Sequence, residues 1–239
     1  MPGLTEAFDR VTGSLANATN LIEVLDVVDV LNDMVVGAHP VLRCPDGCSR
    51  CCNQQIIISE DEWAHFYPDL YASTEEGERR RIVQAAQRLT DPKHGVLKVA
   101  MRAKTPAAFK KEIDALGKRR VNPCVLLLPD GLCRVYANRP MICRAYARVA
   151  RNPGQPMLCL TLNAKLKEQG IDGATLELPD YMPIGHRYFR TAHDDMRYTV
   201  MPVHVLAHIG PDGDLIPEAR PLPRDGSLPV FTREEARIF

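Results

Sequence analysis

The sequence predicts a mainly α-helical protein with short β segments, that is, a small and irregular α+β fold. The first observation is a series of apolar runs that begin with helix-capping residues. The second is that β-type sequence occurs only in short runs. The third is the cysteine content, eight in 239 residues, seven of them in two groups. We expect loops and a short hairpin to carry these cysteines.

A buried helix is expected ahead of the first cysteine group. Asn20 and Glu23 resemble a capping box, residues 21–36 are densely apolar, and Gly37 follows them. After the cysteines, residues 55–58 form a short β-branched run, which predicts a brief strand.

Helices are expected to fill most of the chain between the two cysteine groups. The first begins with the capping residues Ser59 and Glu62 and should stop before Pro68. The second covers residues 74–89. The third covers residues 105–117, because Thr-Pro favours a helix start and glycine favours a helix end.

The second cysteine group begins on a predicted hairpin. Residues 125–128 are apolar and precede the turn sequence Pro-Asp-Gly at 129–131. Cys124 and Cys133 would therefore lie on the two arms of a short hairpin.

The remaining elements follow from turn and helix signals. The turn at 138–140 should begin a helix with Cys143 in its first turn, where the peptide N–H groups favour a thiolate. Residues 160–169 predict another helix. From residue 176 onward prolines recur, and strands and loops are expected, with a β-like stretch at 198–209.

Composition limits the classes of partner. The 30 basic residues balance the 30 acidic ones, so no overall charge favours nucleic acid. No stretch approaches the roughly 18 apolar residues of a membrane span. We expect a cytoplasmic protein that binds neither nucleic acid nor membrane. In a reducing compartment its cysteines would be metal ligands or redox groups.

Four cysteines lie within nine residues at the first group: Cys44, Cys48, Cys51 and Cys52. The second group follows some seventy residues later: Cys124, Cys133 and Cys143, with Cys159 beyond them. A divalent metal or an iron–sulfur cluster needs about four thiolates, which two chain segments can supply. Successive side chains diverge, so the adjacent pair would serve two metals, two corners of a cluster, or one site plus one further thiol.

Other roles for these cysteines are less favoured. Four disulfides are unnecessary in a chain of this length, and a bridge between adjacent cysteines would be strained. Burial as an inert thiol suits Cys159, which lies in an apolar sequence, as well as ligation does. It does not account for four cysteines in nine residues.

The cysteine pattern resembles the CxxCxxCC family, also called the YkgJ type, whose domains are described as zinc- or iron-chelating. The first group matches its first motif with one added residue. The second match includes Pro123-Cys124, Gly131-Leu132-Cys133, Tyr136, Arg139-Pro140 and Cys143-Arg144. Flagellin lysine N-methylases contain a distantly similar cysteine domain, but no glycine-rich loop for a methyl donor is present here.

The resemblance implies a metal centre held by the cysteines, with Cys159 as an eighth candidate. It also implies that Arg139 and Arg144 bind or tune the cofactor, since the family pattern has arginine at both places. Uneven spacing slightly favours an iron–sulfur cluster with a redox or protein-modification role. The alternative is a structural zinc module that recruits another protein. The partner, whether a redox partner or another protein, is not indicated, and neither is any catalytic residue.

Three parts are expected along the chain. Residues 1–40 form an N-terminal helical segment, residues 41–165 form the metal-binding domain with its helical insertion, and residues 166–239 form a covering segment of strands and loops.

Histidines give weaker signals. His204 and His208 have a spacing used by helical metal sites, but no Glu follows His204 and the valine-rich sequence favours a strand. We expect these two to be partly exposed or hydrogen-bonded rather than ligands. The basic aromatic stretch 186–193 could touch a ligand, although such a short patch is usually surface.

Serine substitutions should separate ligands from bystanders. Cys48→Ser or Cys143→Ser should lose most of the bound metal, because each removes a thiolate from the centre. Cys159→Ser should retain at least half. The metal content of each purified variant measures this, and equal retention by all three variants would contradict the expected convergence.

Overall fold

The computed structural model describes residues 3–45, 48–119, 123–152 and 154–237. Ten α-helices and two small sheets are assigned in these residues, which confirms the predicted mainly α class with short β segments. The chain divides into two compact units, each built from two stretches. Unit 1 comprises Met1–Cys51 and Met141–His193, and unit 2 comprises Cys52–Pro140 and Asp194–Phe239. The predicted division at residues 40 and 165 stays a prediction.

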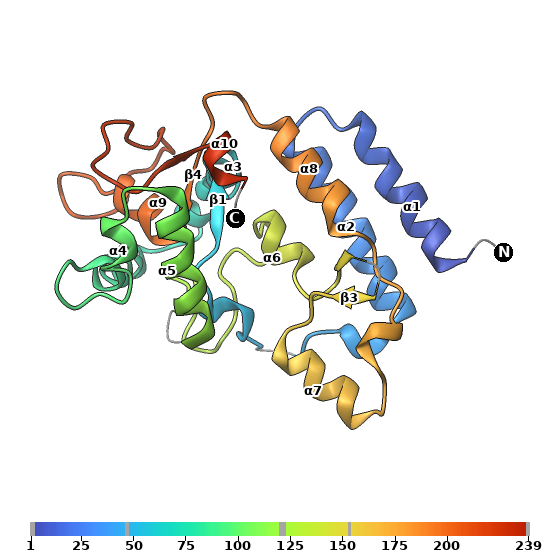
Figure 1. Cartoon of the computed structure of the whole chain (residues 1–239). Coiled ribbons are helices and arrows are strands. Elements are labelled where there is room, and N and C mark those ends of the chain that lie inside the picture. The colour runs from blue at the N-terminus through green and yellow to red at the C-terminus, as the bar shows by residue number, and fades with distance from the viewer. Residues whose placement is uncertain (1–2, 46–47, 120–122, 153, 238–239) are drawn as a thin grey trace. The chain divides into compact units, whose positions relative to one another are not determined.

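Unit 1 is a group of helices with one small hairpin. The helices are α1 (Leu4–Ser14), α2 (Leu21–Ala38), α6 (Met141–Ala145), α7 (Leu160–Glu168) and α8 (Tyr181–Thr191). Short 3-10 turns cover Leu15–Asn17, Pro40–Leu42 and Gly173–Thr175. Strands β2 (Ala150–Asn152) and β3 (Gln155–Pro156) pair antiparallel. Helix α2 packs against α1, α6 and α8, and Figure 1 shows α1, α2 and α8 side by side.

Helix α2 is the central element of unit 1 and confirms the predicted buried helix. The Asn20 side chain accepts a hydrogen bond from the Glu23 N–H at 3.1 Å, and the Glu23 carboxylate accepts one from the Thr19 N–H. The resulting cap fixes the start of the helix. Its apolar face, which includes Val24 and Val35, is fully buried.

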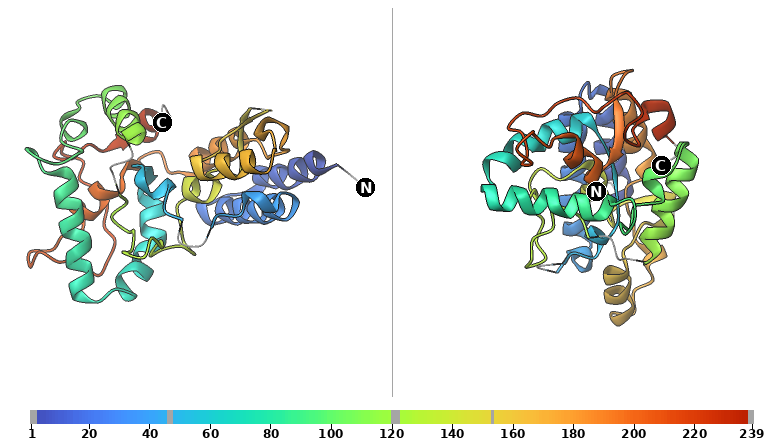
Figure 2. Two further views of the ribbon diagram at one scale, coloured as in Figure 1. Left: turned by 90° about the horizontal axis from the view of Figure 1, so that it is seen from below. Right: turned by 90° about the vertical axis from the view of Figure 1, so that its left-hand side faces the viewer.

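Unit 2 is built around a three-stranded antiparallel sheet in the order β1-β4-β5. The strands are β1 (Ile57–Ser59), β4 (Arg197–Val200) and β5 (Phe231–Thr232). The helices are α3 (Glu60–Ala72), α4 (Glu76–Thr90), α5 (Pro106–Arg119), α9 (Met201–Ala207) and α10 (Arg233–Ala236). Short 3-10 turns cover Ala100–Arg102 and, where the two units join, Cys51–Asn53. Ile58 pairs with Thr199 across β1 and β4. Figure 2 gives two further views of these elements.

The helix that was predicted to stop before Pro68 continues through it to Ala72. Proline removes one backbone hydrogen bond, which usually ends a helix. Here Phe66 and Leu70 on either side are fully buried, so tertiary packing holds the helix together across the proline.

Helix α5 begins where the sequence predicts, with the Thr105 Oγ1 accepting a hydrogen bond from the Ala108 N–H at 3.3 Å. It does not end at Gly117 but extends to Arg119. Leu116 is buried beside this glycine, and its packing outweighs the weak helix preference of one glycine.

The stretch 198–209 is a strand only at its start. Strand β4 ends at Val200, and α9 follows with Pro202 in its first turn, where a missing N–H costs nothing. The expectation of strands and loops after residue 176 is also wrong for α8 and α10, each of which begins with a side-chain cap, at Asp180 and Thr232.

Trp63 is the centre of the aromatic core of unit 2. It stacks on Tyr67 and His204, with ring centroids 5.0 and 5.1 Å apart. The Trp63 Nε1–H donates to His208 Nε2 at 3.1 Å, and the Arg220 N–H donates to the same nitrogen at 3.0 Å. These two donors require an unprotonated Nε2, so His208 carries its proton on Nδ1 and donates it to the His204 carbonyl at 2.7 Å.

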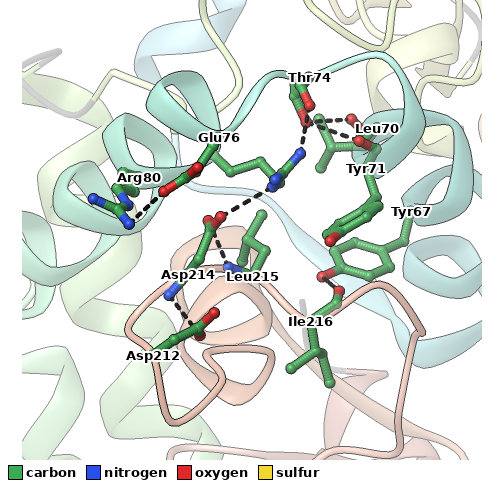
Figure 3. Close-up of polar contacts among 11 residues, drawn as sticks. Tyr67, Leu70, Tyr71, Thr74, Glu76, Arg80, Asp212, Asp214, Leu215 and Ile216 are labelled. Atoms are coloured by element: carbon green, nitrogen blue, oxygen red, sulfur yellow. Dashed lines mark hydrogen bonds and ion pairs between the residues drawn. The ribbon is translucent and has the colours of Figure 1, made fainter.

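A second polar network ties α3 and α4 to the turn after α9 (Figure 3). The Asp214 carboxylate accepts from the Leu215 N–H at 2.8 Å and from Arg79 Nε at 3.2 Å. The Tyr67 hydroxyl donates to the Ile216 carbonyl at 2.5 Å. The Arg79–Asp214 pair is largely buried, so it constrains the packing of α4 more than an exposed pair would.

Because His204 and His208 lie in its core, we expect the folded state of unit 2 to lose stability in acid. Burial, as the main cause, lowers the pKa of His204 to about 3 and that of His208 to about 4, from 6.5. Because the unfolded chain binds protons more readily, stability should be complete above pH 6.5 and fall as the pH drops toward 4. The loss should be about 1.4 kcal/mol per pH unit for each histidine.

Urea unfolding at pH 7 and pH 5, followed by fluorescence of Trp63, the single tryptophan, measures this loss. His204→Leu should halve the pH dependence, whereas His94→Gln, at an exposed position, should leave it unchanged. An unchanged slope in His204→Leu would contradict the assignment.

Candidate metal centre

The boundary between the two compact units falls between the adjacent cysteines Cys51 and Cys52. Unit 1 carries five of the eight candidate ligands: Cys44, Cys48, Cys51, Cys143 and Cys159. Unit 2 carries the other three: Cys52, Cys124 and Cys133. The adjacent pair therefore contributes one residue to each unit.

Cys44 has three other cysteines of unit 1 in electrostatic range. Its residue as a whole is exposed, yet desolvation of the thiol raises its pKa. The nearby Arg148 guanidinium lowers this pKa, while the thiols of Cys48, Cys51 and Cys159 raise it by repulsion between thiolates. Thiolates are the donors that a soft metal prefers, so the surroundings of Cys44 have the right chemistry for such a metal.

Arg148 fits the negative charge that such thiolates would carry. Its Nε is buried and has no hydrogen-bond partner among the described residues. A buried donor without a partner is costly unless something satisfies it. Thiolates bound to a metal are hydrogen-bond acceptors with negative charge, so the residues present suit an anionic metal–thiolate group.

Cys159 and Cys143 lie at helix starts. Cys159 is the N-cap of α7, where its buried Sγ accepts from the Leu162 N–H at 3.4 Å. Cys143 lies in the first turn of α6, which begins directly after Pro140 and confirms the predicted helix start. Both cysteines therefore lie where a helix presents N–H groups that have no partner within the helix.

In unit 2 the predicted hairpin is confirmed. Leu127 and Cys133 form an antiparallel bridge, and the Arg134 N–H donates to the Leu126 carbonyl at 3.1 Å. The Cys124 N–H donates to the Cys52 carbonyl at 2.7 Å. Backbone hydrogen bonds thus hold all three cysteines of this unit in one region.

Among the described residues, no three histidine, cysteine, aspartate or glutamate side chains are arranged so that they could hold a metal ion. The convergence of the predicted ligands therefore stays a prediction, and so does the choice between Cys51 and Cys52.

The arginines near the cysteines have partners of their own. Arg144 is buried and forms an ion pair with Asp29 of α2. Arg139 donates to the Tyr136 carbonyl at 3.1 Å and lies over the Tyr136 ring. Their assignment to the cofactor remains a prediction. Sequence reasoning missed Asp29, because it is one of four acidic residues in the stretch 21–36 and nothing in the sequence distinguishes it from the others.

The histidines that the sequence singled out have structural roles. Both nitrogens of His208 are engaged in the core of unit 2, and His204 donates from Nε2 to the Ile58 carbonyl. In the basic aromatic stretch, Tyr188 is buried and Arg187 donates to the Ala18 carbonyl. These side chains therefore have packing roles.

The clustered thiols and their arginine are typical of a cysteine-rich, metal-chelating domain. The chain belongs to the CxxCxxCC family, described as a putative zinc- or iron-chelating domain, whose model matches residues 43–168. Metal binding, to zinc or iron, thus has support from the family as well as from the thiols. No curated protein and no solved structure matches the chain, so the likeness to flagellin methylases gains no support. No helix in the described chain is both long and apolar enough to cross a membrane.

Arg148→Gln should weaken metal retention by roughly fivefold, because it removes the positive charge beside Cys44. Competition with a chromogenic chelator measures this loss. Arg151→Gln is the matched control, since Arg151 is exposed in the same unit. Identical retention by the two variants would show that Arg148 does not offset charge at the centre.

Proposed function

We propose that residues 41–165 form a metal-binding cysteine centre that carries an iron–sulfur cluster. Its role would be electron transfer, sensing, or a redox-dependent modification of protein side chains. Such a cluster would supply one-electron redox chemistry. The ligands would come from the eight cysteines, with Arg139, Arg144 and Arg148 offsetting their charge. We place the protein in the cytoplasm, with a redox protein as its partner.

The observation that carries this proposal is Cys44, which lies in electrostatic range of Arg148 and of the thiols of Cys48, Cys51 and Cys159 in unit 1. Cys44 and Cys48 lie on irregular chain, Cys51 begins a short 3-10 turn, and Cys159 caps a helix. Zinc knuckles typically use regular Cys-x2-Cys pairs, and this arrangement has no such second pair. Irregular loops around a low-dielectric thiolate group are typical of cluster proteins.

A structural zinc module for protein–protein interaction is the second candidate. It is favoured by two exposed apolar side chains beside Cys133, since Leu132 and Tyr136 are 49% and 58% exposed. Apolar residues held outward next to a metal site are suited to contact another protein.

The metal and acid-labile sulfide content, with an absorbance spectrum, separates the two candidates. The protein should be purified without oxygen from cells supplied with iron. About four irons and four sulfides per chain, with a brown colour, are expected for one cubane cluster. Zinc without sulfide, and unfolding by a chelator but not by a reductant, would replace the cluster with the zinc module.

A further inference from the structure

Unit 2 contains a groove that includes the candidate ligand Cys124 in its lining but is otherwise formed by residues with no part in the cysteine centre. It encloses about 360 Å³ and lies between one face of α4 and residues 123–129. This volume is within the range of small-molecule sites, at its lower end. We call it the α4 groove.

The floor of the α4 groove is apolar. Ile82 of α4 and Val125 and Leu126 of the hairpin line it, and all three also belong to the core of unit 2. A rigid core beneath a groove keeps the groove formed in the absence of a ligand. An occupant would therefore gain apolar contact without first having to open a site.

The rim of the groove is positively charged. Arg81 and Arg88 both line it from α4, seven residues apart, and both are exposed. Neither has an ion-pair or hydrogen-bond partner for its side chain among the described residues. By contrast, the third arginine of the groove, Arg134, is neutralised by Glu78.

We propose that the α4 groove binds a small organic anion with an apolar body, such as a medium-chain carboxylate. The apolar part would cover Ile82 and Val125, and the carboxylate would accept hydrogen bonds from Arg81 or Arg88. A guanidinium beside apolar surface is less screened than one in open water, and its planar fork matches a carboxylate. A neutral or cationic molecule of the same shape lacks this pairing.

Displacement of the fluorescent anion 8-anilinonaphthalene-1-sulfonate from the full-length protein tests the proposal. Octanoate should displace the dye, whereas acetate should not, since it has no apolar body. Octyltrimethylammonium has the same chain with the opposite charge and should not displace it either.

The test variant carries both Arg81→Gln and Arg88→Gln. The matched control carries Arg80→Gln alone. Arg80 lies on α4 and pairs with Glu76 (Figure 3). It is not among the residues that line the groove. The double variant should bind octanoate at least tenfold more weakly, a difference of about 1.4 kcal/mol. The control should bind as the unchanged protein does.

Three outcomes would overturn the proposal: the dye does not bind, octyltrimethylammonium competes as well as octanoate, or the double variant binds octanoate with unchanged affinity. The test is independent of the metal, provided that all samples have the same metal content. If the protein does not bind octanoate, the proposal of a cysteine metal centre is unaffected. If it holds no metal, the proposal of an anion site in the α4 groove is likewise unaffected.

Discussion

One buried hydrogen bond, from the indole N–H of Trp63 to Nε2 of His208, sets the arrangement of unit 2. It is satisfied only while His208 is neutral, and the Arg220 N–H shares the same acceptor. The bond links α3 to the end of α9, and α9 in turn packs on α4. One wall of the α4 groove therefore depends on a polar contact within an apolar core, where losing one partner leaves the other unsatisfied.

A different constraint governs the cysteines. Adjacent side chains diverge, and the boundary between the two compact units falls between Cys51 and Cys52. Around Cys44 the dominant features are three other thiols within electrostatic range of it and one buried guanidinium without a partner on Nε. A buried guanidinium needs a negative partner, and the thiolates of the proposed centre would supply one.

Local signals in the sequence were sufficient where chain neighbours decide the conformation. The cap at Asn20, the cap at Ser59 and the hairpin through Cys133 follow from residues close in sequence. Prediction failed where distant packing decides, as at Pro68, which α3 passes because its neighbours are buried. It also failed for α9, whose valine-rich sequence favours a strand. The helix instead places His204 against Trp63, a contact between residues far apart in the sequence. The spacing of the cysteines was enough to predict a metal centre. It could not show that Arg148 lies near Cys44, because that depends on tertiary contacts.

The interleaved build of the two units has a consequence for synthesis on the ribosome. Unit 1 needs residues up to His193, while unit 2 needs the stretch from Asp194 to Phe239. Unit 1 can thus assemble while β4 and β5, which complete the sheet of unit 2, are still inside the exit tunnel. During that interval β1 has no strand to pair with. The indole N–H of Trp63 also lacks His208, the acceptor of its hydrogen bond. Nascent unit 2 is therefore the part of the chain that would most need protection by a chaperone.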